Sequence, residues 1–136
     1  METEKCVVVI DETLSPGVAA NAAAILGITL GKQLPEVVGE DVQDRRGRKH
    51  LGIIEFPVPV LKASPERLLR LREELYQPEF QDLTAADFPS AAQGCRTYGE
   101  YVEKMAAAED LSYLGVAICG GKKKINRLTG NLPLFR

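Results

Sequence analysis

Residues 11–31, DETLSPGVAANAAAILGITLG, constrain the fold more than any other stretch, because they join an apolar strand to a helix with almost no polar side chains. Residues 6–10 before them, CVVVI, form a continuous apolar run of strand length, which predicts a strand covered on both faces. Ser15 suits the cap of the helix, and Pro16 suits its first position, where the missing N–H costs nothing. The chain therefore begins with a strand, a turn and a helix.

That helix is predicted to be buried. Between residues 18 and 30 only Asn21 and Thr29 have side chains that form hydrogen bonds. A helix that is apolar on all sides is typical of a protein interior. We therefore expect the Asn21 amide to enter a packed region one turn inside the helix N-terminus.

The 136 residues, 45% of them hydrophobic and 26% charged, have the composition of one globular domain, residues 1–136. A chain of this length buries roughly two thirds of its unfolded surface. No apolar run approaches the ~20 residues that cross a bilayer, so no membrane contact is expected. Because the net charge is −2, contact with nucleic acid would have to come from local basic patches.

The three cysteines match neither a disulfide framework nor a zinc motif, and an odd number is unusual in a secreted protein. Cys6 and Cys119 fall in apolar strand segments, where we expect them to be small buried hydrophobic residues. Cys95 lies outside the predicted strands. These features predict a cytoplasmic protein.

Strands and helices alternate along the chain, which predicts an α/β architecture with helices on both faces of a small, mostly parallel sheet. In such sheets ligands bind beyond the carboxyl ends of the strands, here at residues 11–17 and 120–124. Further extended segments are expected at residues 37–42, 51–56, 56–61, 83–88, 112–119 and 132–135, a turn at Gly47, and further helices capped by Ser64 and by Thr97, the latter with Tyr101, Val102, Met105 and Ala108 facing inward.

The two ends of the chain resemble type-two peptidyl-tRNA hydrolases, through residues 5–10 and 17–21 (GVAAN) and residues 125–134 (INRLTGNLPL). Over nearly its whole length the chain resembles more closely an uncharacterised bacterial family, the two-thousandth in the series of domains of unknown function. The resemblance implies a three-layer α/β/α domain with a mixed four-stranded sheet, a peptidyl-tRNA hydrolase type-two-like fold. It also implies a site between the first helix and the C-terminal segment.

The chain differs from the hydrolase pattern where that pattern supplies charge. Ester cleavage needs a positioned proton acceptor and stabilisation of the developing oxyanion. We therefore expect a protein of this fold without peptidyl-tRNA hydrolase activity. The changed positions are Gly17, Asn21 and Ala24 in the first helix, where the hydrolases have lysine, glutamine and histidine, and Lys123 and Asn126 near the C-terminus, where they have acidic residues; Thr129 and Gly130 are retained.

The amide of Asn21, the carboxylate of Asp11 and the hydroxyl of Thr129 are candidates for a pocket that holds an anion or an amide at the start of the first helix. The alternative is that Asn21 ties this helix to the C-terminal turn, since buried amides usually form structural hydrogen bonds. Because the two segments are far apart in sequence, either interpretation requires the chain ends to meet.

Two basic clusters are candidates for phosphate contacts. Lys122, Lys123 and Lys124 follow a Gly-Gly turn, and the backbone donors of such a turn together with lysine charge can clamp phosphate; Asn126 lies beside them. The second cluster is the run RRGRK at residues 45–49. For both, the alternative is a solvated turn, because short charge runs generally face water.

Catalytic candidates are few. His50 is the only histidine, so neither a histidine-based triad nor a multi-histidine metal centre can be assembled, and no metal is expected. His50 is then either a lone acid or base or part of an exposed loop. Arg96 favours a thiolate at Cys95, but no base can be placed near that thiol. The sequence has no GxGxxG and no GKS or GKT motif, and no cofactor is expected.

Three hypotheses follow. The first is a protein that binds an anionic ligand, nucleotidyl or RNA, through Asn21, Thr129, Asn126 and the two basic clusters, the lysines at 122, 123 and 124 and the run at residues 45–49. The second is a hydrolase of an ester or amide, peptidyl-tRNA included, that uses Asp11 or His50. The third is a structural homodimer, paired through the apolar tail at residues 132–135 or through a strand edge.

Overall fold

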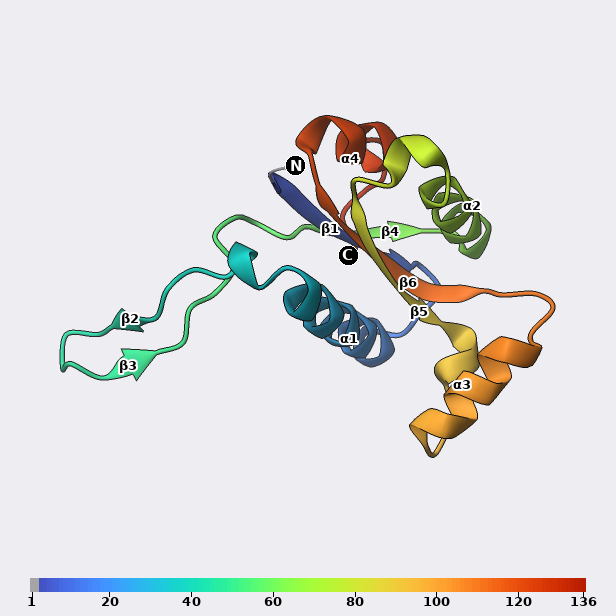
Figure 1. The fold of residues 1–136 in the computed structure, drawn as a ribbon, viewed down its shortest axis with the longest axis horizontal. Coiled ribbons are helices and arrows are strands. Elements are labelled where there is room, and N and C mark those ends of the chain that lie inside the picture. The colour runs from blue at the N-terminus through green and yellow to red at the C-terminus, as the bar shows by residue number, and fades with distance from the viewer. Residues whose placement is uncertain (1–2) are drawn as a thin grey trace.

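A four-stranded sheet with helices on both faces forms the body of the protein in the computed structural model, which describes residues 3–136 (Figure 1). The sheet has the order β4-β1-β6-β5, and β2 pairs with β3 in a separate ribbon. The strands are β1 (Lys5–Asp11), β2 (Val42–Gln43), β3 (Lys49–His50), β4 (Val60–Ala63), β5 (Thr84–Pro89) and β6 (Tyr113–Gly120), and the helices are α1 (Pro16–Gln33), α2 (Pro65–Leu75), α3 (Tyr98–Ala107) and α4 (Lys122–Thr129), with 3-10 turns η1 (Pro35–Val37), η2 (Pro78–Phe80) and η3 (Ser90–Ala92).

Alternation along β1 divides the core into two layers. Val7 and Val9 face the cluster that contains the buried residues of α2 and α4, whereas Val8 and Ile10 face the cluster that contains those of α1. Such alternation is the geometry of any strand, and both sides of β1 are apolar because helices cover both sides of the sheet. The expected strand with two buried faces is confirmed.

The expectation of a mostly parallel sheet is wrong. Only β1 and β4 pair in parallel, whereas β6 lies antiparallel between β1 and β5. A parallel connection needs a crossover that packs on a sheet face. The helix between β5 and β6 does not supply one: α3 has no buried residue and lies beside the end of these strands (Figure 1). The chain therefore re-enters the sheet from the end at which it left.

Helix α1 is buried on one side only, which corrects the expectation of a fully buried helix. Ala19, Ala22 and Leu26 pack against the sheet, but Ile28 is 75% exposed and Asn21 is exposed as well. The sheet can cover only one face of a helix. No other layer of residues 3–136 covers the opposite face of α1 (Figure 1). The exposed Asn21 therefore lies outside the core rather than inside it.

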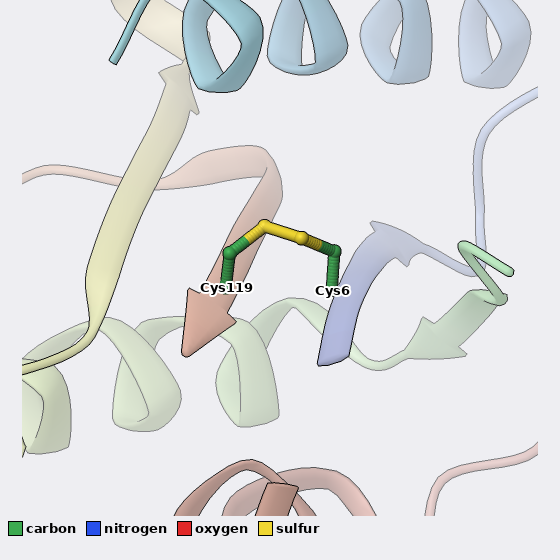
Figure 2. The surroundings of a disulfide bond; sticks show 2 residues. All are labelled: Cys6 and Cys119. Atoms are coloured by element: carbon green, nitrogen blue, oxygen red, sulfur yellow. A yellow bond between two sulfur atoms is a disulfide. The ribbon is translucent and has the colours of Figure 1, made fainter. Parts of the chain in front are cut away.

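Cys6 and Cys119 form a disulfide between adjacent strands, which corrects the expectation of two free buried thiols (Figure 2). They are directly opposite each other in the β1–β6 register, and both side chains lie in the core layer next to α1. Their sequence separation of 113 residues explains why no local spacing indicated the pair. Disulfides persist mainly in oxidising compartments, so this bond does not support the expected cytoplasmic location.

The C-terminal tail closes one edge of the sheet. Leu134 pairs with Leu61 of β4, Lys62 N–H donates to the Pro133 carbonyl at 2.9 Å, and Phe135 N–H donates to the Val60 carbonyl at 2.8 Å. The tail therefore binds within its own chain. An unpaired edge would otherwise invite pairing with another molecule.

Residues 38–56 form a protruding arm, which we call the arm below (Figure 1). The extended segments expected at residues 37–42 and 51–56 are mostly not strands, and only an isolated bridge between Val38 and Ile54 joins them. The two-residue strands of the arm, β2 and β3, lie closer to its turn at Gly47, whose φ of +77° confirms the predicted turn. The arm leaves the body after η1 and returns before β4, and its strands β2 and β3 pair with each other. It therefore adds no strand to the main sheet.

Two of the three predicted caps form a side-chain hydrogen bond, whereas Ser15 stands at the N-cap of α1 without one. The hydroxyl oxygens of Ser64 and Thr97 accept from Arg67 N–H and Glu100 N–H, each at 3.1 Å. Val102 and Ala108, both expected to face inward, are exposed, because α3 rests on η3 rather than on the sheet. No helix among residues 3–136 is both long enough and apolar enough to cross a membrane.

Candidate functional site

A cleft with a volume of about 400 Å³ opens between α1, the end of β5 and α3. Ligand sites commonly have volumes of 300–1,000 Å³. Strand β5 runs in the same direction as β1 and β4, since both β5 and β1 are antiparallel to β6. The cleft therefore lies beyond the carboxyl end of a strand, where ligands collect in α/β sheets. Its walls are Ile25 and Thr29 of α1, Phe88 of β5, Ala92 of η3, residues 95–97, and Tyr98 and Tyr101 of α3.

A tight turn holds the polar wall of the cleft in place. Gly94 has a φ of +78°, in the left-handed region that favours glycine, and it reverses the chain between η3 and Cys95. Arg96 N–H then donates to the Glu100 carboxylate at 2.8 Å, while Thr97 caps the helix. These two bonds join the loop to the first turn of α3, so the backbone that carries the Arg96 side chain is held in place.

The cleft combines a cation with aromatic surface. Arg96 forms no ion pair with any residue between 3 and 136. The rings of Tyr98 and Tyr101 meet edge to face with 5.5 Å between centroids. Burial, and then the charge of Asp87, raise the pKa of Tyr101, so its hydroxyl stays protonated and able to donate at neutral pH.

Cys95 lies in the wall with its thiol donating to the Ala91 carbonyl at 3.3 Å. A cysteine nucleophile needs an adjacent base. Among the described residues that line the cleft there is no histidine, aspartate or glutamate. The cleft thus offers hydrogen bonds, one positive charge and aromatic contacts, which suit binding better than acyl transfer.

Asn21 and Thr129, the pair expected to share a pocket, lie on opposite faces of the sheet. Asn21 is exposed on α1, whereas Thr129 is buried on α4, in the layer that also holds Ile125 and Leu128 (Figure 1). The Thr129 hydroxyl donates within its own helix to the Ile125 carbonyl at 2.8 Å. The expected shared pocket does not form, because the first and last helices cover different faces.

The three lysines expected in a turn form the first turn of α4. Lys122 and Lys123 are exposed, while Lys124 forms an ion pair with Asp82 at 3.0 Å and a hydrogen bond with the Glu79 carbonyl. The same contact with Lys124 lowers the pKa of Asp82. Asn126 accepts from Lys5 Nζ at 2.7 Å. Lys124 and Asn126 therefore have partners in the protein, and Lys122 and Lys123 remain without an ion pair in the described chain.

The two weak catalytic candidates are apart from the cleft lining. Asp11 is buried at the end of β1, where one carboxylate oxygen accepts from Thr13 N–H at 2.8 Å and from the Thr13 hydroxyl at 2.7 Å. His50 is exposed on the arm, 2.8 Å from the Asp44 carboxylate. This contact is the main cause of the lowered pKa of Asp44. Nothing in residues 3–136 gathers three histidine, cysteine or acidic side chains that could hold a metal ion.

Sequence reasoning missed the cleft itself. It noted Arg96 only as the neighbour of Cys95, and it placed Tyr101 in the core. The lining comes from segments that are separated by more than fifty residues, so no local motif connects them. The one available signal was a cysteine, an arginine and two tyrosines within seven residues around a glycine turn.

The fold and the cleft define an α/β domain with a mixed four-stranded sheet and a candidate ligand site at one end. The chain belongs to the family described as protein of unknown function (DUF2000), which matches residues 4–136. Among solved structures, a protein of unknown function from Agrobacterium has the same fold, with a TM-score of 0.86, 17% identity, and coverage of 100% of this chain and 99% of that one. No curated protein sequence matches the chain.

Proposed function

We propose that the protein binds a small planar organic anion of mononucleotide size in the cleft between α1, β5 and α3. One observation carries this proposal: an arginine that forms no ion pair within residues 3–136 stands beside two tyrosines in a cleft of about 400 Å³ at the carboxyl end of a strand. Arginine suits phosphate or carboxylate groups, and tyrosine rings suit the faces of planar ring systems. The sequence also predicted an anionic ligand, but it predicted that other residues bind it.

Each wall has a separate task in this proposal. Arg96 pairs with the anionic group, near the N-terminus of α3, whose dipole also favours negative charge. Tyr98 and Tyr101 contact the ring, and the protonated Tyr101 hydroxyl donates a hydrogen bond. Ile25 and Phe88 contribute apolar surface to the cleft. The ligand is held without covalent chemistry, since no base faces Cys95.

Titration calorimetry with AMP, GMP, CMP, UMP, benzoate and inorganic phosphate tests the proposal. At least one planar anion should bind saturably, and Arg96→Gln should weaken it about tenfold, the loss of roughly one charge-assisted hydrogen bond. Arg70→Gln is the matched control, because Arg70 is an exposed arginine of α2 on the other side of the sheet. No saturable binding at millimolar concentrations, or equal loss in both variants, would contradict the proposal.

RNA binding through α4 is a second candidate function. Lys122 and Lys123 stand exposed in the first turn of a helix, where the dipole disfavours cations, so a phosphate there would relieve that repulsion. Binding of a short RNA that weakens with salt and is lost in Lys123→Glu, but not in Arg96→Gln, would support this surface. Binding that neither variant changes would exclude it.

We also infer that the chain lacks peptidyl-tRNA hydrolase activity. The retained Thr129 is buried and bonded within α4, and Asn21 is on the opposite face, so the residues expected at the hydrolase site do not meet. The resemblance to that family itself stays a prediction. A turnover assay with peptidyl-tRNA should show no rate above background. A rate that Asp11→Ala or His50→Ala removes would contradict this inference.

A further inference from the structure

The outer face of α1 carries no charged residue from Gly17 to Ile28, and Lys32 in the last turn is the one charged residue of this helix. Gly17, Asn21, Ala24 and Ile28 follow one another at intervals of four, three and four residues, so they form one stripe on the side away from the sheet. No atom outside the helix comes within 4 Å of a Cβ built at Gly17, Gly27 or Gly31. Surface helices normally carry charged residues on this side.

Helix α2, on the other face of the sheet, shows the ordinary pattern. Its exposed positions include Glu66, Arg70, Glu73 and Glu74. The two helices differ in this way although they belong to the same chain and pack on the same sheet. The difference indicates that the outer face of α1 is built to be covered, because an exposed stripe of small and apolar residues marks an interaction surface.

The arm supplies a second uncovered surface next to α1. Leu51 is 79% and Ile53 is 80% exposed, although the arm is braced by defined backbone bonds. Gly39 N–H donates to the Ile53 carbonyl at 2.9 Å, and Glu55 N–H donates to the Val37 carbonyl at 3.0 Å. The two segments of the arm also approach closely outside β2 and β3, where a Cβ on Gly52 would lie 1.8 Å from the Gly39 carbonyl oxygen. The arm therefore has a defined backbone conformation, although the apolar side chains of Leu51 and Ile53 are not buried within their own chain.

The charges of the arm and of α3 are complementary. Residues 41–50 carry four cations and two acids, and neither Arg45 nor Arg46 forms an ion pair in the described chain. Residues 98–110 carry four acids and one lysine. In Figure 1 the arm and α3 lie on opposite sides of α1. A two-fold axis through the outer face of α1 would carry the arm of one copy toward α3 of the other.

We propose that a second copy of this chain covers α1, with the two α1 helices packed through the stripe of Gly17, Asn21, Ala24 and Ile28 and with each arm against α3 of its partner. The small side chains of the stripe let two helices approach closely. In this arrangement the same surfaces of both copies form the interface, as in isologous two-fold dimers. It does not depend on the ligand proposed for the cleft.

Sedimentation equilibrium of the intact protein, at a series of protein concentrations up to about 100 µM, tests this dimer. The wild type should dimerise, and Ile28→Glu should raise the dissociation constant at least about tenfold. Leu69→Glu is the matched control, because Leu69 is an exposed apolar residue of α2 on the opposite face of the sheet. Circular dichroism melting of each variant verifies folding, which an exposed substitution should leave intact.

Charge reversal tests the contact between the arm and α3. Arg46→Glu should weaken the dimer, and combining it with Glu103→Lys should restore at least part of the affinity. A wild type that remains monomeric at about 100 µM would overturn the proposal, as would a dimer that Ile28→Glu leaves unchanged. A dimer weakened by Ile28→Glu but equally sensitive to Leu69→Glu would also contradict it.

Discussion

Arg72 of α2 and Asp87 of β5 form an ion pair in which the arginine Nε donates to the carboxylate at 2.7 Å, with their side chains only 12% and 19% exposed. The same guanidinium lies 4.0 Å from the centre of the Tyr76 ring. This pair joins a helix to an edge strand, and it lies behind the strand whose other face contributes Phe88 to the cleft.

Asp87→Asn should lower the free energy of unfolding by about 2 kcal/mol, because it leaves the Arg72 charge without its partner in a largely water-excluded position. Urea unfolding monitored by circular dichroism measures the change. Glu79→Gln is the control: its ion pair with Arg127 is more than half exposed on both sides, and its loss should cost less than about 0.5 kcal/mol. Equal effects of the two variants would contradict this reading of the pair.

Reduction of the Cys6–Cys119 bond should lower the free energy of unfolding by about 2–4 kcal/mol, because the bond closes a loop of 113 residues in the unfolded chain. The urea midpoint with and without reductant measures the change, and a thiol titration should count one free cysteine before reduction. Cys95→Ala should respond to reductant as the wild type does. An unchanged midpoint would show that the bond contributes nothing to stability.

Alkaline pH should destabilise the protein through Tyr113. Burial, followed by the charge of Asp87, raises the pKa of Tyr113 to about 12, whereas the unfolded chain has the ordinary value of 10.0. Because the folded pKa is the higher one, the stability linked to this group is complete below pH 10 and is lost as the pH rises toward 12. Tyr113→Phe should therefore lose stability less steeply than the wild type in that window, measured by urea unfolding at several pH values.

Gly115→Ala should destabilise the protein by roughly 1–3 kcal/mol, since overpacking forces neighbouring side chains from their positions. A Cβ at this point of β6 would lie 2.8 Å from Ile10 Cδ1 and 2.9 Å from Leu26 Cδ1. Gly27→Ala, in α1 with open space around it, should instead gain up to about 1 kcal/mol from helix propensity. Melting temperatures of the two variants that move in the same direction would contradict the prediction.

The sequence by itself determined the elements whose signal is local. The apolar runs at residues 6–10 and 112–119 predicted β1 and β6 because burial on both faces leaves no polar alternation. Ser64 and Thr97 predicted two helix starts because a cap bonds to an N–H only three residues away. The turn at Gly47 followed from the backbone freedom of a single residue.

Only the tertiary structure decided how these elements meet. The direction of β6 depends on whether the intervening helix crosses a sheet face, and α3 does not. The Cys6–Cys119 bond and the cleft join residues that are distant in sequence, and no periodicity records such pairings. The sequence predicted that this helix is apolar, but composition does not show which side of it the sheet covers. A helix of small apolar residues meets the requirements of a core and of an interface alike, because both demand the exclusion of water and neither demands charge.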